Sequence, residues 1–128
     1  MKILIETIPH SEQRYNTVGD YTRTPDGWHI RVSQLPDWRE EALIAVHELV
    51  ELLLCEARGI PDAAIDVWDM TWVPYYTTET GWVNEPGADP SAPYYHEHVC
   101  ATGVELLLAK ELGVKWELYE SHILALGD

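Results

Sequence analysis

Short segments in which apolar residues alternate with polar ones open the chain. Residues 2–8 are rich in isoleucine and leucine and predict a strand. Residues 28–33 alternate between apolar and polar side chains at every step, which is the period of a half-buried strand. Residues 15–22 form a further candidate strand, and the Pro-Asp-Gly run at residues 25–27 has the composition of a tight turn. The pattern predicts a small antiparallel sheet at the N-terminal end.

From residue 42 onward the pattern is mainly helical. Residues 42–57 are apolar on most sides, with Asp37 as the expected N-cap and Gly59 as the expected stop. Further helices are expected at residues 61–70, 94–112 and 115–126. Strands followed by two long helices and shorter ones predict an α+β fold, formed by residues 1–128 as a single domain.

Residues 73–93 interrupt the helical pattern with several prolines and two glycines. A connection of this length is unusual in a compact domain and is often functional. It could act as a lid or specificity loop. The interpretation that we favour is an Ω-like loop held in place by its own aromatic side chains, Tyr75, Tyr76 and Trp82.

The net charge of the chain limits the classes of partner that it can bind. The formal net charge is -14, and the few lysines and arginines are spread along the chain. A nucleic-acid backbone would be repelled, so a cation or a basic partner is the more natural ligand. No apolar run is long enough for a signal peptide or a membrane span, so we expect no membrane partner and a cytoplasmic location. The oligomeric state is open.

Candidate chemistry lies on the first long helix. His47 and Glu51 are four residues apart and therefore project from one helix face, where they can hold a divalent ion. Glu48 is rotated to the side, where it can reach a water on that ion without being a ligand. Charged groups inside an apolar helix are costly unless exposed, paired or metal-bound. The competing interpretation is a solvated acidic face.

The second long helix supplies the missing imidazole. It begins with Tyr94 and carries His96 and His98, followed by Glu105. Either histidine could complete a His, Glu, His set, and we favour His98 because it lies deeper in the helix and shares its face with alanines. Glu105 lies two turns further along that face. Two imidazoles and a carboxylate are typical of zinc, with magnesium or manganese as alternatives.

These residues resemble the zincin fold, in particular its minimal gluzincin-like domains. The resemblance spans residues 28–105: a strand, a short connection and a helix bearing His47-Glu48-Leu49-Val50-Glu51. In that family the helix carries two histidine ligands around a catalytic glutamate, and a downstream helix gives a glutamate ligand. Here the two ligand types look exchanged. The chain also resembles small bacteriophage proteins with the same five-residue segment, which implies the host cytoplasm but no established activity.

The resemblance implies metal-assisted hydrolysis of a peptide or other small substrate. Glu48 would be the catalytic proton acceptor, and the metal ligands would be His47, Glu51 and His98. A strand at residues 28–33, if it lies at the sheet edge, could pair with an extended peptide. The candidates for an oxyanion helper are Tyr94, Tyr95 and His96.

Two other functions compete with this one. Glu48 and Glu51, followed by Asp66 and Asp69, resemble the carboxylate pairs of all-α nucleotide pyrophosphohydrolases, which would hold magnesium. The alternative without turnover is a non-enzymatic phage protein, stabilised by a metal in a closed four-ligand site or binding a host factor through its acidic surface.

Overall fold

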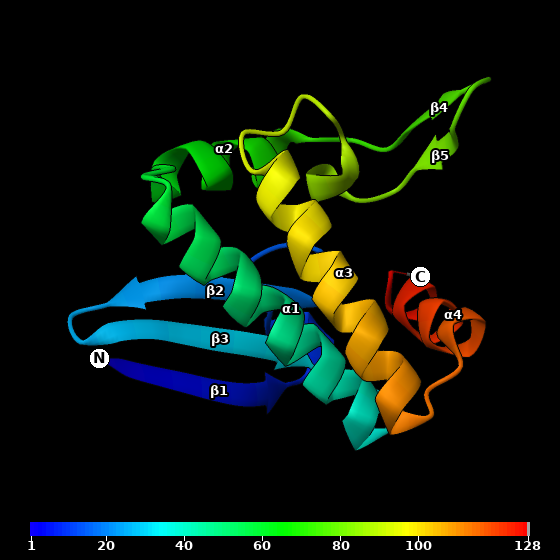
Figure 1. Cartoon of the computed structure of the whole chain (residues 1–128), viewed down its shortest axis with the longest axis horizontal. Helices are drawn as coiled ribbons and strands as arrows, with labels where there is room; N and C mark the ends of the chain where they lie inside the picture. The colour runs from blue at the N-terminus through cyan, green and yellow to red at the C-terminus, as the bar shows by residue number, and fades with distance from the viewer. Residues whose placement is uncertain (128) are drawn as a thin grey trace.

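The computed structural model describes residues 1–127, and it confirms the α+β layout of a small sheet followed by helices (Figure 1). The sheet contains β1 (Lys2–Ile8), β2 (Gly19–Thr24) and β3 (Gly27–Ser33). The helices are α1 (Trp38–Ala57), α2 (Asp62–Thr71), α3 (Tyr95–Leu112) and α4 (Trp116–Leu126). Among the described residues no helix combines the length and the apolar composition needed to cross a bilayer.

The sheet is mixed rather than wholly antiparallel. Its strand order is β1-β3-β2, with the expected antiparallel hairpin between β2 and β3 but with β1 parallel to β3. The inner face of β3 is fully apolar, and Ile30 and Val32 are completely buried. Strand β3 is the most buried and lies at the centre of the sheet. Strand β1 pairs with the edge of β3 opposite to β2. Residues 28–33 therefore do not meet the condition of lying at the sheet edge, and the edge strands are β1 and β2.

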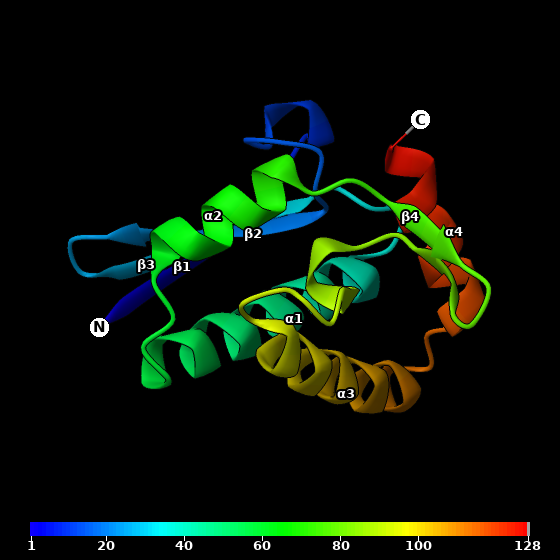
Figure 2. The ribbon, with the colours of Figure 1, turned by 90° about the horizontal axis from the view of Figure 1, so that it is seen from above.

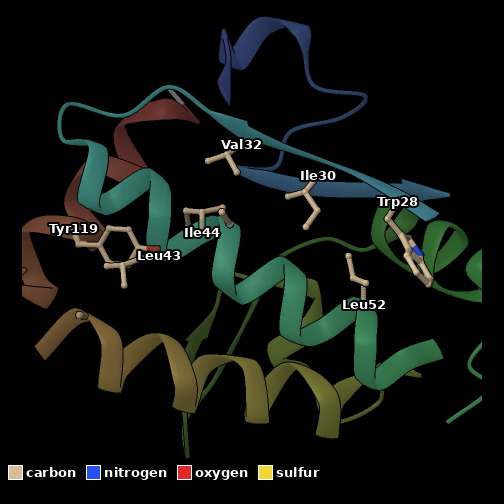
Figure 3. Close-up of a cluster of buried hydrophobic side chains, with 9 residues drawn as sticks. Trp28, Ile30, Val32, Leu43, Ile44, Leu52 and Tyr119 are labelled. Carbon is tan, nitrogen blue, oxygen red and sulfur yellow. The ribbon is translucent and has the colours of Figure 1, made fainter. Parts of the chain in front are cut away.

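Helix α1 covers one face of this sheet (Figure 3). Ile30 and Val32 point from the sheet toward Ile44 and Leu52 on α1, and these side chains form one buried cluster. Tyr119 of α4 belongs to the same cluster and is itself fully buried. Burial of each such side chain stabilises the fold by about 1.5–3 kcal/mol. The core therefore fixes α1 on the sheet and α4 beside it.

The ends of the long helices follow local chemistry. Asp37 is the N-cap of α1, because its side chain accepts a hydrogen bond from the backbone N–H of Arg39. Glycines with positive φ follow α1 and α3, at 68° for Gly59 and 71° for Gly113. Both helices thus end beside the glycines that were expected to terminate them.

Residues 73–93 contain more structure than the expected Ω-like loop. They form a hairpin of β4 (Tyr75–Thr77) and β5 (Gly81–Val83), then a 3-10 turn η2 (Pro86–Ala88). The hairpin projects from the body of the molecule in Figure 1. Seen from above, the chain then returns between α2 and the start of α3 (Figure 2), and η2 contacts both helices. This return places residues 84–87 beside α3.

Candidate metal centre

Helices α1 and α3 pack side by side and bring three side chains to one point. His47 Nε2 lies 3.2 Å from Glu51 Oε2, and His98 Nδ1 lies 3.0 Å from the same oxygen. The two imidazole nitrogens are 3.2 Å apart. Each side chain keeps only 7–13% of its surface exposed. Two nitrogen atoms and one oxygen atom therefore form a nearly equilateral triangle inside the protein.

The size of this triangle fits a metal ion. In a tetrahedral zinc site with bonds of about 2.05 Å, neighbouring ligand atoms lie about 3.3 Å apart. The three atoms of the triangle are separated by 3.0–3.2 Å. Two imidazole nitrogens and one carboxylate oxygen are also a donor set that zinc commonly takes in catalytic sites. Geometry and donor chemistry agree.

The outer nitrogens of both imidazoles face carboxylates. His47 Nδ1 lies 2.7 Å from Glu105 Oε1, and His98 Nε2 lies 3.1 Å from Glu85 Oε2. A carboxylate accepts the proton of the nitrogen that faces it, which favours the tautomer with the lone pair on the other nitrogen. In both rings that other nitrogen is the one in the triangle. Two lone pairs and an anionic oxygen then point at a common centre, which a cation satisfies.

Helix α4 supports this arrangement from behind. The hydroxyl of Tyr119 donates a hydrogen bond of 2.6 Å to Glu105 Oε2, while Oε1 of the same carboxylate faces His47. Glu105 and Tyr119 are both buried. The chain from Tyr119 through Glu105 to His47 therefore connects the hydrophobic core to the proposed ligand.

The pKa values of the three side chains indicate how the same site behaves when protons, rather than a metal ion, occupy it. Burial lowers the pKa of His47, but hydrogen bonds to Glu105 and Glu51 outweigh it and raise that pKa to about 11. For His98 burial also lowers the pKa, and Glu51 and Glu85 raise it to about 9. Burial raises the pKa of Glu51, but the two imidazoles lower it below the usual value. The centre thus attracts positive charge strongly, and a metal ion competes with protons for it.

Glu48 lies next to the triangle in an open cavity of about 700 Å³. Burial and the nearby charge of Glu51 raise the pKa of Glu48 well above its ordinary value. Gly19 on β2 makes room for this side chain, because a Cβ there would lie 2.6 Å from Glu48 Oε1. The Glu48 carboxylate therefore packs against Gly19 of β2. It lines the same cavity as the three candidate ligands.

A second glycine fits against His98. A Cβ on Gly87 would lie 2.5 Å from His98 Nδ1 and 2.9 Å from the ring of Tyr94. Side chains larger than hydrogen would therefore push the imidazole away from Glu51. The turn η2 thus packs closely over one of the three candidate ligands.

The opposite wall of the cavity holds its acids differently. Arg14 forms two hydrogen bonds with Asp20, of 2.6 and 2.9 Å, and one of 3.1 Å with Asp66. Asp69 accepts hydrogen bonds from the hydroxyls of Tyr15 and Tyr94. Burial raises the pKa of Asp69 to about 6, against these two hydrogen bonds. The acids of this wall therefore find their cation, Arg14, and their hydrogen-bond donors, the two tyrosines, within the chain.

The structure brings together the three residues expected as ligands, and it separates the two candidate histidines. His98 faces His47, whereas His96 is exposed and lies 4.0 Å from Cys100 Sγ on another side of α3. Tyr94 lies against the His98 ring, but its hydroxyl is bound to Asp69.

Sequence reasoning missed several supporting residues. Glu105 was expected as an additional site residue, and it faces His47 rather than the central point. The roles of Gly19, Glu85, Gly87 and Tyr119 were not foreseen. A glycine at the start of a strand and one in a Pro-Gly turn were the available signals, and neither indicates its neighbour across the fold.

Comparisons with known proteins add no relative: no protein-family model, curated protein or solved structure matches the chain. The function must therefore be argued from the site.

Proposed function

We propose that the chain is a metal-dependent hydrolase, with zinc held by His47, Glu51 and His98. The observation that supports this most is the triangle of ligand atoms at 3.0–3.2 Å, in which each imidazole is oriented by a carboxylate on its other nitrogen. Among the described residues these three are the group that can hold an ion. Three protein ligands beside an open cavity are typical of catalytic zinc, whereas structural zinc usually takes four.

Glu48 is the proposed general base. A zinc ion held by His47, Glu51 and His98 would supply a bound water with a pKa of about 7 and a polarised substrate carbonyl. Glu48 borders the same cavity as the ligands, and Gly19 leaves space for its carboxylate. It accepts a proton from the attacking water and transfers it to the leaving group. The Tyr94 hydroxyl donates its hydrogen bond to Asp69, so it is not free to act as the oxyanion helper.

An extended peptide is the proposed substrate class. Strand β2 is an edge strand, and its residues from Gly19 to Arg23 line the cavity. The free edge of such a strand can pair with the backbone of a peptide. A scissile carbonyl aligned along β2 then lies near Glu48, because Gly19 is in contact with that side chain. Strand β2, rather than the central strand β3, is therefore the proposed docking strand.

The pyrophosphohydrolase alternative has less support. Asp66 and Asp69 line the same cavity as Glu48 and Glu51. However, Asp66 is paired with Arg14 and Asp69 with two tyrosines, so the four carboxylates do not converge. The sheet also differs from the all-α fold of those enzymes.

The test combines metal content with hydrolysis. Protein purified without chelator is expected to contain one zinc ion per chain by elemental analysis, and His98→Ala is expected to lose it. Glu48→Gln should keep the zinc but lose cleavage of a peptide pool. Glu111→Gln, on the exposed side of α3, is the matched control and should change neither. Full zinc content in His98→Ala would overturn the metal centre, and unchanged cleavage by Glu48→Gln would overturn the mechanism.

A further inference from the structure

The hydroxyl of Tyr21 is a buried polar group without a partner. Among residues 1–127 it forms no hydrogen bond, although its oxygen is shielded from solvent. A buried unsatisfied hydroxyl destabilises the fold, so such groups are rare in native proteins. Phenylalanine would fill the same space without this cost. The hydroxyl therefore calls for an explanation beyond packing.

Tyr21 lies over the face of α1 that carries the proposed ligands. It belongs to β2, two residues after the Gly19 that contacts Glu48, and it packs against the core under the sheet. Burial raises the pKa of Tyr21, and the next contributions come from the charge of Glu51 and from Cys55. Glu51 and Cys55 are one helical turn apart on α1. The hydroxyl thus stays protonated. Cys55 is a neighbour of the hydroxyl, and Tyr21 lines the same cavity as Glu51.

Glu51 has an oxygen to spare. Oε2 makes the contacts with both His47 and His98. Neither of those contacts involves Oε1. The thiol of Cys55 is only a weak acceptor. Of the two neighbours, the carboxylate is the stronger acceptor for a neutral hydroxyl, because hydrogen bonds to charged groups are roughly twice as strong.

We propose that Tyr21 is a positioning residue for the metal centre, donating its hydroxyl to Glu51 Oε1 when Oε2 binds the ion. This inference rests on the proposed function. A donor on the second oxygen keeps the carboxylate monodentate and leaves the remaining coordination position to water. Loss of such an outer partner typically weakens metal binding 10- to 100-fold.

The test compares Tyr21→Phe with the wild-type chain by competition against a chromogenic zinc chelator. The dissociation constant for zinc is expected to rise at least about 10-fold. The melting temperature of the metal-free variant should equal or exceed that of the wild type, because an unsatisfied hydroxyl has been removed. In cobalt-substituted protein the visible absorption should weaken, as the freed carboxylate becomes bidentate and the coordination number increases.

Two controls separate the possible outcomes. Cys55→Ala removes the other neighbour of the hydroxyl and should leave zinc affinity unchanged. Tyr76→Phe removes an exposed hydroxyl on β4 and should change nothing. Wild-type zinc binding with an unchanged dissociation constant in Tyr21→Phe would overturn the role of Tyr21 alone. Absence of zinc binding in the wild type would overturn the proposed function and this inference together.

Discussion

The two walls of the cavity hold similar acids but neutralise them in different ways. On the α2 side, Arg14 binds Asp20 and Asp66, and two tyrosines bind Asp69. On the α1–α3 side, the carboxylates of Glu51, Glu85 and Glu105 face imidazoles.

The difference lies in what each wall requires from outside. The guanidinium of Arg14 is a permanent cation, so the first wall is complete within the chain. Histidine can give up its proton, and both imidazoles direct their free nitrogens at one point. The second wall is therefore complete only with protons or a metal ion. Within one cavity, the arginine wall provides structure and the histidine wall provides the proposed binding site.

Removing the metal is expected to give the largest effect. A ligand at 1,000 times its dissociation constant stabilises the fold by about 4 kcal/mol. For a chain of this size, this corresponds to a fall of roughly 12–20 °C in melting temperature on chelation. Calorimetry with and without chelator measures it. The His47→Ala variant should show no response to chelator, and an equal response in both proteins would contradict the role of this wall.

Removing the Arg14 guanidinium from the α2 side of the cavity should lower stability without weakening metal binding. Arg14→Met leaves Asp20, which is only 5% exposed, without its partner. The expected loss is about 2 kcal/mol in the free energy of unfolding, measured by urea denaturation. Zinc affinity should stay within about twofold of wild type. Arg23→Met removes a cation whose carboxylate partners are half exposed, so it should lower the free energy of unfolding less than Arg14→Met does. A large drop in zinc affinity in Arg14→Met would mean that the walls are not independent.

Gly87→Ala should disturb the metal site through shape alone. The added methyl would meet His98 Nδ1, so the imidazole must shift, and zinc affinity should fall about 10- to 100-fold. Gly103→Ala is the matched control, because a Cβ there meets nothing. That variant should keep zinc affinity and gain about 0.5–1 kcal/mol from higher helix propensity. Equal affinities in the two variants would argue against close packing of η2 on His98.

The smallest effect concerns the pH dependence of the α2 wall. The pKa of Asp69 is raised to about 6 in the folded chain, so the folded state holds this proton more tightly than the unfolded state. Stability from Asp69 is thus present at low pH and lost as pH rises through about 6. Asp69→Asn should come closest to the stability of wild type below about pH 4, and its advantage should grow as pH rises to about 6 and then stay constant, by urea denaturation. A difference independent of pH would contradict this explanation.

The grouping of His47, Glu51 and His98 was predictable because the relevant geometry is local or nearly so. The spacing of His47 and Glu51 puts them on one helix face in any α-helix. The choice of His98 over His96 followed from its apolar neighbours, and Ala101 and Ala109 are indeed 0% and 3% exposed. Those alanines mark the face of α3 that packs inward.

The parts that sequence did not predict depend on tertiary pairing. Strand propensity located β1, but nothing local says that it pairs with β3 in parallel. Glu85 and Gly87 reach His98 only because the β4–β5 hairpin sends the chain back toward α3. Tyr119 reaches Glu105 only after α4 docks in the core. Such contacts follow from the packed fold and have no periodic signature along the chain.

The support that Tyr119 gives to Glu105 has a consequence for the order of events during synthesis. A ribosome releases His47 and Glu51 early, His98 and Glu105 much later, and Tyr119 last of this group. A nascent chain that has just exposed its imidazoles still lacks the hydroxyl that anchors Glu105. Tight capture of an ion is therefore expected only after α4 has left the exit tunnel, so the proposed activity would begin only once α4 has docked.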